Sequence, residues 1–243
     1  MKVALISDLH GNELALRAVL ADAAELGVDR FVCLGDVATL GPHPGEVLGM
    51  LRDLGCTCIR GNHDDFLLEP ELVHRYTQAP IVIDSVEWCR SQISKDDLAF
   101  LATFEPTAHC TLDGSTTLYS FHGSPRSHME DILAETPPEV LDEMLAGQRA
   151  TLMAGGHTHV QMLRQHRGVL LVNPGSVGMP FREYVFGRAP TVLAHAEYAV
   201  IDASSGNVSV TLRRVALERA ALQRAVTGSS LPLASALLEQ YQS

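Results

Sequence analysis

Residues 3–12 read VALISDLHGN, a short apolar run followed at once by Asp8, His10 and Asn12. Runs of this length, bounded by glycine and polar residues, are typical of buried strands. Polar side chains directly after a strand lie at its carboxyl end, which is where open sheets bind their ligands. We therefore expect a strand over residues 2–7 that delivers potential ligands to one edge of a sheet.

The same arrangement occurs four more times along the chain. Apolar runs at 31–34, 56–60, 118–121 and 151–155 are each followed by potential ligands. The ligand-bearing segments are Gly35-Asp36, Gly61-Asn62-His63-Asp64, His122-Gly123 and Gly156-His157-Thr158-His159. We expect all five segments to converge on one edge of a sheet. Carboxylate, amide and imidazole groups brought together in this way predict a site for divalent metal ions.

Helical patterns separate the first strands. Strands at 2–7, 30–34 and 56–60 alternate with helices at 13–27 and about 44–54, a βαβαβ unit that predicts parallel pairing. For the middle of the chain we expect the following elements: a short helix and loop at 64–80, a helical stretch at 83–104 broken and capped at 94–97, two strands within 108–122, a helix at about 138–147 and a strand at 150–154.

Beyond residue 160 the pattern favours antiparallel structure. We expect a strand at 169–172, a hairpin of strands 199–202 and 208–212 around Ser205-Gly206-Asn207, and a helical tail over about 216–243. The whole chain, residues 1–243, is interpreted as a single domain in which two sheets pack face to face with helices outside.

Composition narrows the classes of partner. The net charge of −11, from 29 acidic and 18 basic residues, argues against duplex nucleic acid, which is bound through clustered Lys and Arg. No apolar run approaches the roughly 20 residues needed to cross a membrane, and the chain starts in a strand, so we expect a cytoplasmic protein with no membrane partner. The five cysteines form no C-x-x-C pair, and we expect reduced thiols. An exposed antiparallel edge and the C-terminal helices hint at a homo-oligomer.

Spacing indicates how the ligands could share metal ions. Asp8 and His10 are two residues apart, so on a continuing strand both side chains would point to one face and reach one ion. Asp36, at the tip of the next strand, could give one oxygen to each of two ions. The remaining ligands that complete the two coordination shells are Asn62, His122, His157 and His159.

With these motifs in this order, the chain resembles the calcineurin-like metallophosphoesterase superfamily over about residues 2–202, and in size it is similar to the small bacterial and archaeal phosphodiesterases related to YfcE. The resemblance implies an α/β fold, a four-layer α/β/β/α sandwich that holds two divalent metal ions. It implies that the first ion is held by Asp8, His10, Asp36 and His159. It implies that the second ion is held by Asp36, Asn62, His122 and His157.

The implied activity is that of a dinuclear metal-dependent phosphodiesterase. A hydroxide that bridges the two ions attacks phosphorus in line, and His63, which the ligand set does not use, assists the leaving group as general acid or electrostatic stabiliser. Asp64 could orient His63 or cap the helix that follows. Asn12 could contact phosphate or cap the helix at 13–26, and Arg126 could reach substrate from the loop after His122.

The sequence leaves several alternatives open. The same site could serve a phosphomonoesterase or a hydrolase of dinucleoside polyphosphates such as diadenosine tetraphosphate. A non-catalytic binding scaffold is the alternative from another class, although the complete ligand set speaks against it. We expect Mn²⁺ as the metal, while Fe²⁺, Zn²⁺, Co²⁺ or Ni²⁺ would suit the same ligands. The expected partner is a small phosphodiester or nucleotide substrate.

Overall fold

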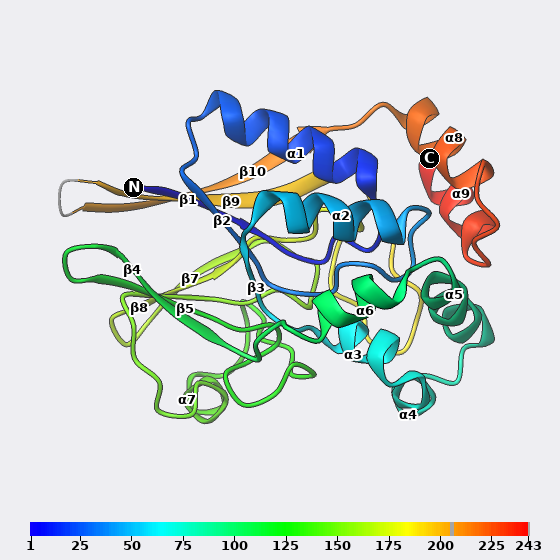
Figure 1. The fold of residues 1–243 in the computed structure, drawn as a ribbon. Helices are drawn as coiled ribbons and strands as arrows, with labels where there is room; N and C mark the ends of the chain where they lie inside the picture. The colour runs from blue at the N-terminus through cyan, green and yellow to red at the C-terminus, as the bar shows by residue number, and fades with distance from the viewer. Residues whose placement is uncertain (205–206, 243) are drawn as a thin grey trace.

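The computed structural model describes residues 1–204 and 207–242 and contains two mixed sheets of five strands each (Figure 1). The first sheet has the order β10-β9-β1-β2-β3. Its strands are β1 (Lys2–Ile6), β2 (Arg30–Cys33), β3 (Thr57–Cys58), β9 (His195–Ser204) and β10 (Asn207–Ala216). The first three strands pair in parallel, as the βαβαβ pattern predicted, and β9 and β10 add to the edge of β1 as an antiparallel hairpin. The predicted hairpin turn at 205–206 lies outside the described residues.

Helices cover the outer face of this sheet (Figure 1). These helices are α1 (Glu13–Glu25) and α2 (Pro44–Leu54). α6 (Lys95–Leu101) packs against α2, and α8 (Arg219–Thr227) and α9 (Ala234–Gln242) pack against each other at the far end of this layer. Asn12 caps α1 by accepting a hydrogen bond from the backbone N–H of Ala15, and α2 ends at Gly55 in the left-handed conformation. Ser94 caps α6 in a capping box with Asp97, which confirms the break expected at 94–97.

The second sheet has the order β4-β5-β6-β8-β7. Its strands are β4 (Ala108–Asp113), β5 (Thr116–Ser120), β6 (Leu152–Ala154), β7 (Met162–His166) and β8 (Val169–Asn173). β8 contains the strand expected at 169–172, and it pairs antiparallel with β7, a strand not expected from the sequence. β8 also runs parallel to β6, so the antiparallel structure expected beyond residue 160 is found only in part. The β7–β8 hairpin places β7 at the edge and returns β8 beside β6 in the same direction.

A hydrophobic layer joins the two sheets. Val3, Leu5 and Leu34 of the first sheet and its loops share one buried cluster with Leu118 and Leu152 of the second. A separate cluster lies between the first sheet and its helices, and another lies between the second sheet and α7 (Pro138–Met144). These three apolar interfaces make the four layers α/β/β/α, the fold class expected from the sequence.

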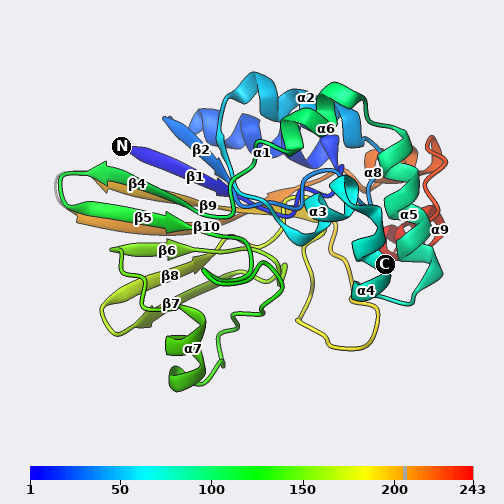
Figure 2. The same cartoon turned by 60° about the horizontal axis from the view of Figure 1, so that its bottom comes forward.

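The remaining helical segments lie beyond the carboxyl ends of the first sheet (Figure 2). They are α3 (Asn62–Leu68), the 3₁₀ turn η1 (Pro70–Leu72), α4 (Val73–Tyr76) and α5 (Pro80–Ser91). Among the described residues, the helices are all too short or too polar to cross a membrane. The ligand-bearing segments follow β1, β2 and β3 of one sheet and β5 and β6 of the other. The site is therefore built at the shared end of two sheets rather than at the edge of one.

Candidate metal centre

The chain leaves its strands abruptly at the ligand positions. Asp8, His10 and Asp36 have φ values of 53°, 43° and 57°, and His157 and His159 have 67° and 57°. Left-handed backbone is unfavourable for residues with a Cβ atom, so these positions are strained. The expectation that Asp8 and His10 continue a strand and share its face was therefore wrong. Both side chains reach the site because the backbone turns at each of them.

Asp8, His10 and His159 form the first group of potential ligands. Each offers one ligand atom, and these atoms lie within 4.8 Å of one another. His159 Nε2 is 3.2 Å from Asp8 Oδ1 and 3.1 Å from His10 Nε2. All three side chains are buried. Three ligand atoms at this spacing match the requirement of a single divalent ion.

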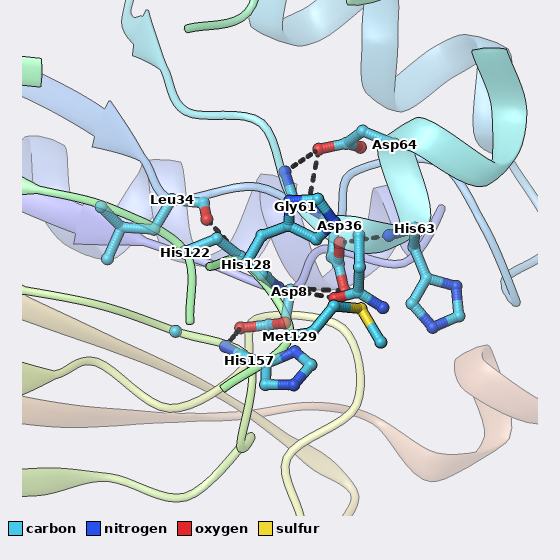
Figure 3. A network of polar contacts seen from close by, with 12 residues as sticks. Asp8, Leu34, Asp36, Gly61, His63, Asp64, His122, His128, Met129 and His157 are labelled. Carbon is cyan, nitrogen blue, oxygen red and sulfur yellow. Dashed lines mark hydrogen bonds and ion pairs between the residues drawn. The ribbon is translucent and has the colours of Figure 1, made fainter. Parts of the chain in front are cut away.

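Asp36, His122 and His157 form the second group, with the same spread of their ligand atoms. His122 Nε2 lies 3.3 Å from Asp36 Oδ2 and 3.1 Å from Asn62 Oδ1, so the amide predicted as a ligand belongs to this group. The backbone N–H of His157 donates to Asp8 Oδ2 at 3.1 Å, which ties the second group to the first (Figure 3). The structure thus brings together all seven residues predicted as metal ligands.

Carbonyl oxygens fix the orientation of two of the imidazoles. His122 Nδ1 lies 2.6 Å from the carbonyl of Leu34, and His159 Nδ1 lies 2.7 Å from the carbonyl of Met179. Donation from Nδ1–H leaves the Nε2 lone pair directed into the site, the arrangement that metal-binding histidines usually show. Asp8 Oδ1 is a buried acceptor without a hydrogen-bond partner among the described residues, although His159 Nε2 lies 3.2 Å from it. These observations fit a site built to hold cations.

Imidazolium groups balance the buried carboxylates in the metal-free protein. Burial would raise the pKa of Asp8, yet the adjacent His159 lowers it to about 2. Burial would lower the pKa of His122, yet Asp36 raises it to about 10. His10 and His157 have their pKa values lowered to about 3, first by burial and then by neighbouring imidazoles. Metal binding would displace the protons from His122 and His159, so we expect affinity to rise with pH.

His63 lies beside the metal groups at the first turn of α3. Its backbone N–H donates to Asp36 Oδ1 at 2.8 Å, and its ring packs against the rings of His10, Phe66 and Tyr76. Burial lowers the pKa of His63, so the imidazole is neutral near pH 7. Nδ1 has no hydrogen-bond partner among the described residues. A neutral imidazole held in this way can donate its N–H to a substrate oxygen.

Asp64 does not orient His63. Its Oδ2 accepts from the backbone N–H groups of Gly61 at 2.8 Å and Asp36 at 3.0 Å, and its Oδ1 accepts from Val37 at 2.9 Å (Figure 3). Of the two roles considered from the sequence, the structure shows the cap, because Asp64 closes the first turn of α3 onto Gly61. It also holds the loop of Asp36 in place. Gly61 itself has to be glycine, since a Cβ atom there would collide with the Asp36 carboxylate.

The two residues predicted to bind substrate are engaged within the protein. Besides capping α1, Asn12 donates from Nδ2 to the carbonyl of Gly178 at 3.1 Å, so both ends of its amide are used. Arg126 forms a bidentate ion pair with Glu130, with Nη2 to Oε1 at 2.7 Å and Nε to Oε2 at 3.0 Å. The capping alternative for Asn12 is confirmed. The guanidinium of Arg126 is already occupied by Glu130.

Other residues at the site carried no sequence motif. Asp131 Oδ1 lies 3.5 Å from His157 Nε2, and Asp131 Oδ2 accepts from the hydroxyl of Tyr184 at 2.6 Å. Phe181 stacks on the His159 ring with centroids 4.2 Å apart. Thr39 Oγ1 lies 3.2 Å from His10 Nδ1. These partners come from distant parts of the chain, and no local pattern marks them.

Comparisons with known proteins agree with this geometry. The model of the calcineurin-like phosphoesterase superfamily domain matches residues 1–204. The chain belongs to this family. Within the calcineurin-like phosphoesterases, an uncharacterised protein of Methanocaldococcus jannaschii, MJ0912, is 30% identical over 193 residues, 73% of this chain and 76% of that protein.

Two solved structures cover nearly the whole of this calcineurin-like phosphoesterase. A metallophosphoesterase from Sphaerobacter thermophilus is 25% identical, covers 100% of this chain and 99% of its own, and has a TM-score of 0.76. A hypothetical protein from Pyrococcus horikoshii, PH1004, is 19% identical, covers 98% and 97%, and has a TM-score of 0.82. The second likeness supports the fold.

Proposed function

We propose that this protein is a dinuclear metal-dependent phosphodiesterase. The observation that carries the proposal is the pair of adjacent ligand groups, Asp8/His10/His159 and Asp36/His122/His157, linked by the hydrogen bond from His157 N–H to Asp8. Two divalent cations there would supply a hydroxide nucleophile at neutral pH and neutralise the phosphoryl oxygens. We expect Mn²⁺ first, with Fe²⁺, Zn²⁺, Co²⁺ or Ni²⁺ as alternatives.

Two side chains of this protein, Asp36 and His63, would act together with the metal ions. Asp36 presents Oδ2 to His122 and Oδ1 to the backbone N–H of His63, so one carboxylate connects the second ligand group to the backbone that carries the candidate catalytic imidazole. His63 would donate a hydrogen bond to the leaving oxygen of the substrate, a contribution of about 10²–10⁴-fold for a positioned acid or donor. The buried surroundings of His63, formed with Phe66, would keep water away from it.

The setting of the enzyme is part of the proposal. We propose a small phosphodiester or nucleotide substrate and a cytoplasmic location. The unpaired state of the cysteines is in keeping with a reducing compartment.

Hydrolysis of bis-p-nitrophenyl phosphate tests the proposal. Protein stripped of metal should be inactive and should recover turnover when Mn²⁺ is added. Asn62→Ala should lose at least a hundredfold in kcat/KM and bind less metal by elemental analysis. Asn207→Ala, which removes the same group from an exposed position of β10, serves as the matched control. Wild-type turnover in the Asn62→Ala variant, or turnover independent of metal, would contradict the assignment of the site.

A further inference from the structure

A carboxylate that no ligand group uses stands beside the candidate metal centre. Asp131 Oδ1 is 3.5 Å from Nε2 of the predicted ligand His157, and the Asp131 side chain is 35% exposed. Its other oxygen is fixed by the hydroxyl of Tyr184, a residue of the segment between β8 and β9. Two segments far apart in sequence therefore position one negative charge where solvent reaches the site.

The surrounding charges do not cancel this carboxylate. Arg126, the nearby arginine of the same segment, is paired bidentately with Glu130. His128 lies 3.7 Å from Asp65, a second acidic side chain. Within the described residues, the recorded partners of Asp131 are the Tyr184 phenol and the His157 imidazole, and no lysine or arginine is among them.

Apolar groups accompany the charge. Met129, two residues before Asp131, is 40% exposed and is drawn among the residues of Figure 3, and Tyr76 is 45% exposed and packs on Phe66 and on His63. Burial, and after it the charges of Asp36, Asp131 and Asp8, raises the pKa of the Tyr76 hydroxyl. The rim thus combines an acidic group with exposed apolar and aromatic surface. An aryl group or a nucleobase could pack there, whereas a second phosphate would face Asp131.

We infer that Asp131, held by Tyr184, is a specificity-determining residue that makes the site favour singly charged phosphodiesters with an apolar or aromatic arm over doubly charged phosphomonoesters. The inference rests on the proposed phosphodiesterase function. A like charge near the bound phosphoryl group penalises each additional negative charge of the ligand. At a separation of about 6 Å and an effective dielectric of about 40, between the values for a protein surface and for water, the penalty corresponds to roughly tenfold.

The test compares Asp131→Asn with Asp142→Asn in the metal-loaded protein. Asp142 is a matched control because its side chain is also 35% exposed and also contacts a histidine, His166. Asp142 itself lies on α7 and belongs to neither ligand group. Asp131→Asn should raise the ratio of kcat/KM for p-nitrophenyl phosphate to kcat/KM for bis-p-nitrophenyl phosphate about tenfold, whereas Asp142→Asn should leave this ratio unchanged. Calorimetry with phenylphosphonate, a dianion at pH 8.5, should show about tenfold tighter binding to Asp131→Asn only.

The outcomes separate the inference from the function on which it rests. An unchanged preference and unchanged phosphonate affinity in Asp131→Asn would overturn the inference while diester hydrolysis stands. Equal shifts in both variants would also overturn it, because the effect would then come from net charge. If wild-type protein hydrolyses neither ester with any of the divalent metals, the proposed function fails, and phosphonate binding alone decides whether Asp131 disfavours dianions.

Discussion

Replacing Asp64 by Asn should lower stability because three backbone donors depend on its carboxylate. Both oxygens of Asp64 are buried and accept from Gly61, Asp36 and Val37. The amide of Asn offers one acceptor, which can keep two of these bonds, and it turns an NH₂ group towards the third donor. The change is nearly isosteric, so it alters the hydrogen bonds without opening a cavity.

The size of the effect follows from these contacts. One lost bond to a charged acceptor costs about 1.5–3 kcal/mol, and a buried N–H without a partner costs about 1–3 kcal/mol. Burial, and after it repulsion by Asp36, raises the pKa of Asp64 to about 7, so the neutral amide recovers part of the loss. We expect a net destabilisation of about 3 kcal/mol, which lowers the Tm of a chain of this length by roughly 6–12 °C.

Thermal unfolding followed by circular dichroism in EDTA measures this directly. Asp65→Asn is the matched neighbour, because Asp65 contacts Arg60 and His128 only at 3.8 Å and 3.7 Å. Its loss should change stability by about 0.5 kcal/mol or less. If Asp64→Asn unfolds within 1 °C of Asp65→Asn but has an altered pH–rate profile, the capping argument fails and the role of orienting His63 is restored.

Three further expectations follow from the site. His63→Gln should lower kcat for diester hydrolysis by about 10²–10³-fold and leave the metal content, measured by elemental analysis, unchanged. Loss of metal from this variant would instead show that His63 belongs to the coordination shell. Gly61→Ala should unfold at a temperature well below that of the wild-type protein, because its Cβ atom would meet the Asp36 carboxylate. Gly49→Ala, in the open middle of α2, should instead raise the free energy of unfolding by about 0.5–1 kcal/mol. Equal Tm values for the two variants would refute the predicted collision. The pKa of Asp64 in the folded protein lies above its unfolded value of 3.8, so the contribution of Asp64 to the stability of the metal-free protein falls as pH rises through about 4–7. In urea unfolding, Asp64→Asn should therefore lose more free energy of unfolding near pH 5 than near pH 8.

Much of the fold was predictable because the apolar runs are short and bounded by glycine. The alternation over the first 65 residues predicted β1, β2 and β3 and their parallel pairing, and Ser94 correctly marked the start of α6. The pairing of β8 with β6 was not predictable, since neither strand carries a pattern that specifies its neighbour.

The site was predictable in its membership but not in its geometry. The seven ligands follow strands and could be read as a set, yet the turn of the backbone at Asp8 and His10 has no signature in residue type. The three backbone bonds to Asp64 and the Asp131–Tyr184 contact, 53 residues apart, depend on how loops pack. Sequence periodicity carries no information about such long-range polar contacts.

The left-handed backbone at five of the ligand positions has an evolutionary consequence. Each such residue costs on the order of 1 kcal/mol relative to glycine or a relaxed conformation, so the ligand loops are held against local preference by the rest of the fold. Random substitution of these ligands by Gly or Asn would therefore tend to relax the chain. A library of variants selected for heat resistance alone, without metal, would lose its aspartate and histidine ligands among the first changes. Thermal stability and the ability to bind metal would therefore evolve in opposite directions.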